Sequence, residues 1–207
     1  MLGAEALCVA FSVAYFLSST FMLTASTVFH TFCCMSARAY NFFAKLDYIG
    51  IAVQIIGSYG FISYYLFRCD PVALWVYVGL VLVCGASVVW VTLFKNIHTP
   101  GYEKHRLGLF LGFGFSVIVC GPQAVMIHGW GPFLSLLWRL GILGLLYVVG
   151  AMIYGFQIPE RWNHIRFVDQ MPRSHPIWHC FVLGASLWHF YTCFWLSKDA
   201  HFSAPCK

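Results

Sequence analysis

The segment from Val72 to Phe94 reads VALWVYVGLVLVCGASVVWVTLF and carries no charged side chain. A helix of roughly 20 apolar residues is long enough to cross the hydrocarbon core of a bilayer. Comparable apolar segments recur along the chain, and together with this one they run approximately over Ala6–Phe29, Ile49–Phe67, Val72–Phe94, Leu107–Ile127, Phe133–Phe156 and Ile177–Leu196. The sequence therefore predicts an all-α fold, a multi-pass transmembrane bundle of six helices.

The composition supports a membrane protein. Of 207 residues, 60% are hydrophobic, 19% are aromatic and only 9% are charged, whereas a soluble domain needs more polar residues to wet its surface. The connections between the apolar segments are short and no repeat is visible, so we interpret residues 1–207 as a single domain. The first segment lacks a basic leader and a clear cleavage site, which predicts that Met1 is retained. Small residues are expected to allow close helix packing at Gly79, Gly85, Ala86, Gly141, Gly144 and Gly150.

The basic residues predict the orientation, because Lys and Arg in short loops resist translocation. With six crossings, one side of the membrane holds Arg38, Lys45, Lys95, Lys104, Arg106, Arg161, Arg166 and Arg173. The other side holds Arg68, Arg139, Lys198 and Lys207. We therefore place the first side in the cytoplasm of a plasma membrane or endomembrane, with both termini outside or in a lumen. The net charge of +5 follows from this distribution and gives no reason to expect nucleic acid as a partner.

The nine cysteines include no CxxC pair, so neither a redox dithiol nor a thiolate zinc site is predicted. Cys33 and Cys34 follow the first apolar segment, a position compatible with acylation and equally with free thiols. Cys69 and Cys206 both fall on the outer side. A disulfide between them is chemically permitted there, although the sequence does not require one.

Ionisable residues at the edge of a bilayer are costly and need a partner. His30 closes the first apolar segment, Asp47 opens the second, and His175 and His179 open the sixth, so counting crossings brings all four to the cytoplasmic side. The spacing of four places His175 and His179 on one helix face. Three imidazoles with an open fourth position describe a catalytic zinc site. Asp47 would hold a water there and accept its proton.

Each of these residues also has a simpler interpretation. His30 could bond a backbone carbonyl, Asp47 could cap its helix, and the pair His175 and His179 could reach toward the interface. Ser26, one turn before His30, could contact the water or a substrate carbonyl, or bond back to its own helix. Ser174 is expected to cap its helix, and Gln54 either lines a cavity or forms an interhelical hydrogen bond. No metal role is expected for His98, His105, His128, His164, His189 and His201.

Several stretches together resemble the seven-helix progestin and adipoQ receptors, and among them the adiponectin receptors. They are residues 26–36 (STVFHTFCCMS), 45–51 (KLDYIGI), 158–161 (IPER), 174–179 (SHPIWH) and 189–191 (HFY). Their order and mutual spacing match that family over nearly the whole chain. The combination is far more specific than any one of them.

The resemblance implies a Zn²⁺ ion held by His30, His175 and His179, with Asp47 and Ser26 around the bound water. It implies hydrolysis of a lipid amide, of the ceramidase type, with ceramide or a fatty acid as the membrane lipid. It also implies receptor signalling to an extracellular protein or steroid ligand, and it is compatible with a homo-oligomer. The alternatives are a receptor or scaffold with a structural zinc and an inactive truncated form.

The sequence departs from the family at two places. Six apolar segments are found where seven are typical, because the usual first helix has no counterpart before Met1. A shortened isoform, a fragment and a wrongly assigned start are the interpretations that this leaves. After residues 158–161 the loop reads WNHIR over residues 162–166, unlike the nearest subgroup.

Overall fold

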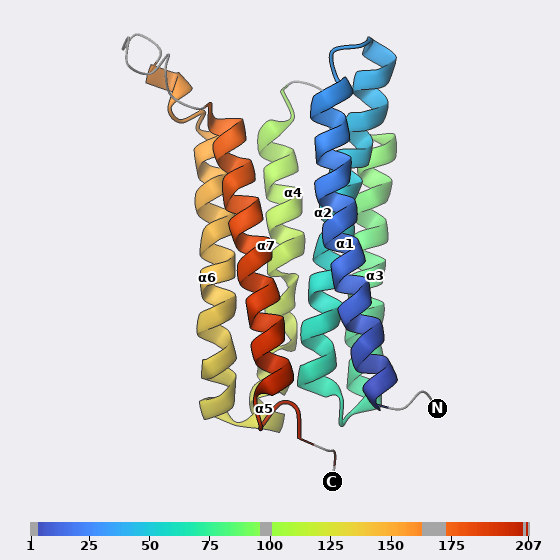
Figure 1. The fold of residues 1–207 in the computed structure, drawn as a ribbon, viewed down its shortest axis with the longest axis vertical. Helices are drawn as coiled ribbons and strands as arrows, with labels where there is room; N and C mark the ends of the chain where they lie inside the picture. The colour runs from blue at the N-terminus through green and yellow to red at the C-terminus, as the bar shows by residue number, and fades with distance from the viewer. Residues whose placement is uncertain (1–3, 96–100, 163–172, 205, 207) are drawn as a thin grey trace. The chain divides into compact units, whose positions relative to one another are not determined.

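The computed structural model describes residues 4–95, 101–162, 173–204 and 206. These residues form α-helices and short 3-10 helices, with no strand among them (Figure 1). In chain order they are α1 (Ala4–Phe32), α2 (Ala37–Phe67), α3 (Pro71–Phe94), α4 (Glu103–Phe115), η1 (Ser116–Cys120), α5 (Gly121–His128), α6 (Trp130–Gly155), η2 (Glu160–Trp162) and α7 (Ser174–Lys198). Within the described chain, 6 segments are long and apolar enough to span a membrane. The predicted all-α, multi-pass fold is confirmed.

The second helix begins much earlier than expected. We placed its start at Ile49 and took Asp47 to open it, but α2 starts at Ala37, so Asp47 lies well inside the helix. The cause is a helix cap: the Ser36 hydroxyl accepts a hydrogen bond from the Ala39 amide at 3.1 Å. An apolar run marks the part of a helix inside the bilayer, whereas capping marks where the helix begins.

The fourth membrane segment is interrupted, although a continuous helix was expected. It consists of α4, the 3-10 turn η1 and α5. Pro122 has no amide N–H and cannot donate to the carbonyl four residues earlier, so the α-helical ladder cannot pass this point unbroken. The Ser116 hydroxyl donates to the Phe113 carbonyl at 2.7 Å and stabilises the turn.

The described chain forms two compact units: Met1–His128 with Lys198–Lys207 (unit 1), and Gly129–Ser197 (unit 2). A single domain over residues 1–207 stays a prediction. In unit 1, helices α1 to α4 alternate in direction, and α2 packs against α1, α3, α4 and α5. Its core is the cluster of Ala52, Tyr59, Val81, Val88 and Phe113. In unit 2, α6 and α7 run antiparallel.

Two of the predicted small residues lie at close helix contacts. A Cβ added at Gly85 would lie 2.5 Å from Ile56 Cδ1, so α2 and α3 meet there. At Gly150 it would lie 2.6 Å from Phe181 Cβ, where α6 meets α7. For Gly79 and Gly141 the expectation was wrong, since a Cβ at either would meet nothing within 4 Å.

The permitted disulfide is present between Cys69, just after α2, and Cys206. Cys33 and Cys34 lie between α1 and α2, at the opposite end of unit 1, and both are free thiols. Unit 1 thus has a disulfide at one end and a vicinal pair of thiols at the other.

Candidate metal centre

Ser26 and Asp47 are brought together where α1 packs on α2. A Cβ added at Gly50 would lie 3.0 Å from the Met22 backbone, so the two helices approach closely one turn away. The Ser26 side chain lies within hydrogen-bonding reach of the Asp47 carboxyl. Asp47 is only 8% exposed. This contact with Asp47 is neither of the two interpretations given for Ser26, and its predicted contact with a water or a substrate carbonyl stays a prediction.

His30 lies in the last turn of α1, one turn beyond Ser26. The spacing of four puts both side chains on one helix face. The rings of His30 and Phe29 are in edge-to-face contact, with centroids 4.9 Å apart, and His30 is an exposed residue. In unit 1, an imidazole and a buried carboxyl therefore belong to the same helix pair.

His175 and His179 lie on one face of the first two turns of α7. Their Nε2 atoms are 3.0 Å apart and their ring centroids 4.8 Å apart. Both side chains are half-buried, and the Tyr154 ring of α6 packs edge-on against His175 at 5.2 Å. Two nitrogens at this separation either share one proton or direct both lone pairs at one cation. The donor pair fits two of the nitrogen ligands of a zinc ion.

The start of α7 is fixed by Glu160, a residue to which the sequence analysis gave no role. Its Oε1 accepts hydrogen bonds from the Ser174 amide at 2.7 Å and the Ser174 hydroxyl at 2.9 Å. Ser174, expected to cap the helix, is its first residue, and the carboxylate supplies the acceptor instead. A negative charge is favourable at a helix N-terminus. The signal in the sequence was the acid of the IPER motif, 14 residues before the first residue of the helix that carries the histidine pair.

The rest of α7 is held by α6 through aromatic and cationic contacts. The Trp188 indole N–H donates to the Arg139 carbonyl at 2.8 Å. The Arg139 guanidinium lies 4.4 Å from the Trp138 ring centroid and 3.6 Å from that of Trp195. Such cation–π contacts offset part of the cost of a charge in an apolar setting. The helix that carries the histidine pair is therefore rigidly supported within unit 2.

Of the other residues singled out in the sequence, some lie in the described part of the chain and some outside it. Gln54 accepts hydrogen bonds from the Ser18 hydroxyl at 3.1 Å and the Ser19 hydroxyl at 2.9 Å, so the interhelical interpretation is the one that the structure shows. His98 and His164 lie outside the described residues. The structure thus brings Ser26 to Asp47 in unit 1 and His175 to His179 in unit 2, while His30 belongs to unit 1.

These features define a class: a multi-pass helical membrane protein with imidazoles near helix ends and a buried acid inside a helix. A model of the family described as "Haemolysin-III related" matches residues 3–190. The chain belongs to this family. The resemblance to the progestin and adipoQ receptors inferred from the motifs is confirmed, since the matched relatives include a protein named for adiponectin.

The relatives carry informative names. The chain is 34% identical over 181 residues to the adiponectin receptor protein of Drosophila melanogaster, covering 86% of this chain and 40% of that protein. It is 32% identical to heptahelical transmembrane protein 4 of Arabidopsis thaliana, covering 86% of this chain and 46% of that one. The rice heptahelical transmembrane protein ADIPOR2 is 33% identical, with 81% of this chain and 73% of that protein covered. The chain thus spans less than half the length of the first two.

Proposed function

We propose that this chain is a zinc-dependent hydrolase of membrane lipid amides, coupled to receptor signalling as in an adiponectin-receptor-like protein. In this proposal His30, His175 and His179 supply three nitrogen ligands to one zinc ion. The observation that carries it is the 3.0 Å separation of the His175 and His179 Nε2 atoms on a rigid helix start. The Ser26 and Asp47 pair in the α1–α2 hairpin supports it independently.

A zinc ion would supply Lewis acidity toward the amide carbonyl and a water of low pKa. Asp47 accepts the proton of the attacking water and delivers it to the departing nitrogen, the ordinary task of a carboxylate general base. Ser26 holds the Asp47 carboxyl in one orientation through a hydrogen bond. Glu160 fixes the histidine-bearing helix start through Ser174. Water and a ceramide-like amide would yield a fatty acid and a sphingoid base.

The proposal places the zinc ligands on the cytoplasmic side. Lys and Arg are more frequent in the loops on that side. The disulfide at the other end of unit 1 agrees with this, because disulfides persist in oxidising compartments outside the cytosol. The exposed Cys34 thiol offers a direct test. In sealed cells, a membrane-impermeant maleimide should label Cys34 only after permeabilisation; labelling of intact cells would reverse the orientation.

The zinc site is tested by elemental analysis of the purified full chain beside an assay of fatty acid release from ceramide. We expect about one zinc per chain and measurable release, and loss of both in His175→Ala. His105→Ala, an exposed imidazole on α4, is the matched control and should change neither. A chain without stoichiometric zinc contradicts the metal site. A chain with zinc and no release contradicts the hydrolase and favours a structural ion.

A further inference from the structure

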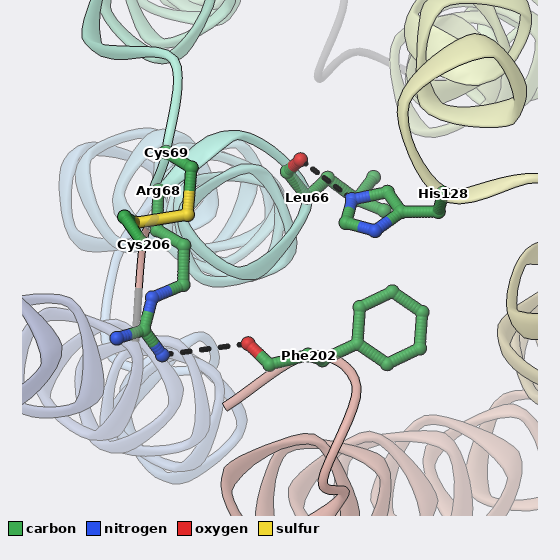
Figure 2. Close-up of a disulfide and its surroundings, with 6 residues drawn as sticks. All are labelled: Leu66, Arg68, Cys69, His128, Phe202 and Cys206. Atoms are coloured by element: carbon green, nitrogen blue, oxygen red, sulfur yellow. Dashed lines mark hydrogen bonds between the residues drawn. A yellow bond between two sulfur atoms is a disulfide. The ribbon is translucent and has the colours of Figure 1, made fainter. Parts of the chain in front are cut away.

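The chain after α7 folds back onto the end of α2 in unit 1. Cys206 is bonded to Cys69, and the Arg68 guanidinium donates to the Phe202 carbonyl at 3.4 Å (Figure 2). Phe202 is 2% exposed, and its ring lies 5.0 Å from that of His128. The carboxylate of Asp199 accepts hydrogen bonds from the His201 amide at 3.0 Å and the Phe202 amide at 3.3 Å. The segment therefore has one defined position.

His128, the last residue of α5, is oriented by the end of α2. Its Nε2 lies 2.8 Å from the Leu66 carbonyl oxygen, as Figure 2 shows. A carbonyl only accepts, so Nε2 carries the proton. In the neutral ring, Nδ1 then presents a lone pair. That lone pair is directed at His201, whose Nε2 is 3.0 Å away.

This arrangement has the chemistry of a metal site. Histidine ligands of metal ions almost always donate their other ring N–H to a carboxylate or a backbone carbonyl, as His128 does to Leu66. For an ion ~2.1 Å from each nitrogen, the N–metal–N angle would be roughly 90°, which suits two neighbouring ligands of one ion. The separation equals that of His175 and His179.

The pair of His128 and His201 is accessible to water, and both an acidic and a basic side chain lie near it. His201 is exposed, and it follows the membrane-spanning part of α7, which ends at Lys198. The nearby carboxylate of Asp199 favours a cation. The positively charged guanidinium of Arg68, the residue that follows α2, donates to the Phe202 carbonyl. An aqueous ion can therefore reach both nitrogens without crossing the bilayer core.

We propose that His128 and His201 form a binding site for a divalent transition metal ion, separate from the zinc ligands considered above. Copper, nickel and zinc are the ions that imidazole pairs prefer. The ion joins two residues that are 73 positions apart in the sequence. Binding fastens the segment after α7 to the end of α5. Water completes the coordination. Neither residue was expected to bind a metal, because their distance along the chain concealed their contact.

The test uses the full chain in lipid nanodiscs with His175→Ala and His179→Ala, so that failure of the proposed zinc site cannot influence the result. Cu²⁺ is titrated at pH 7.5 and followed by electron paramagnetic resonance. We expect one saturable ion with hyperfine splitting from two nitrogens. His201→Ala should weaken binding by at least about tenfold and leave one nitrogen, since even supporting partners of metal ligands are worth about 10- to 100-fold in affinity.

The control is His105→Ala, which should bind Cu²⁺ as its parent does. Because His201 is exposed, its replacement should leave the fold unchanged, which a melting curve without metal verifies. Equal affinity and equal splitting in the His201→Ala chain would overturn the proposal. So would saturable binding with a single nitrogen in the parent. Either result would leave the pair as a hydrogen bond between neutral rings.

Discussion

Two histidine pairs in the described part of the chain share one nitrogen–nitrogen distance but have different structural origins. His175 and His179 lie on a single helix, where a spacing of four alone brings the rings together. His128 and His201 belong to segments that only the tertiary fold and a disulfide bring into contact. The first pair should therefore tolerate changes in packing. The second should depend on everything that holds the chain end in place.

Moving one ring off the helix face should have the largest effect. In His179→Ala with Cys180→His, the imidazole turns by about 100° around α7 and can no longer join His175. Under the proposed function we expect zinc to be lost and hydrolysis to fall about 10³-fold, as removal of several kcal/mol of transition-state stabilisation implies. Elemental analysis and fatty acid release measure both. Cys180→Ala, which alters the same exposed position alone, should change neither zinc content nor hydrolysis. If the double variant retained zinc, the spacing of four on α7 would not be what creates the site.

Asp47→Asn separates catalysis from metal binding. Removing a general base should lower the rate of ceramide hydrolysis by about 10²- to 10⁴-fold while the zinc content stays the same. Asp70→Asn makes the same chemical change at the cap of α3, where the carboxylate accepts from the Ala73 amide. Because Asn is also a good cap, that control should keep its activity within about twofold. Loss of zinc from the Asp47 variant would instead indicate a closed, structural site.

Gly150→Ala probes how far the helix pair depends on packing. The added methyl group would meet Phe181 Cβ at 2.6 Å, and overpacking of this kind costs about 1–3 kcal/mol. We expect a lower melting temperature in detergent, with the zinc content kept. Gly141→Ala, on the same helix with nothing within 4 Å, should melt close to the parent. If zinc were lost together with stability, the idea that helix spacing alone sets the pair would be wrong.

The smallest expected effect concerns the disulfide. Cys69→Ser with Cys206→Ser frees the chain end and lowers the effective concentration of His201 near His128. Copper affinity at that pair should fall about tenfold or less, measured by the same titration in the nanodisc background. Zinc at the other pair, measured in a chain that keeps His175 and His179, should be unaffected. Unchanged copper affinity would show that Phe202 and Arg68 alone hold the segment.

The features that could be predicted from the sequence are those set by residues close together along the chain. Six apolar segments were recognised because bilayer thickness requires a minimum helix length, and the contact of His175 with His179 followed from helical periodicity. The start of α2 was missed because a serine cap, not hydrophobicity, sets it. The contacts of Glu160 with Ser174 and of His201 with His128 were missed because they arise between segments that only folding brings together. Ser26 and Asp47 were expected around one bound water rather than in contact with each other, and the close approach of α1 and α2 at Gly50 explains why they lie together.

The Cys69–Cys206 bond also closes most of the chain into a covalent ring. A protease that cuts once anywhere between these two positions opens the ring without releasing a fragment. On a gel run without reductant, nicked and intact chains would therefore have the same mass. Limited proteolysis of this protein becomes informative only when each digest is also run with the thiols reduced, and a band that appears only then identifies a cut inside the ring.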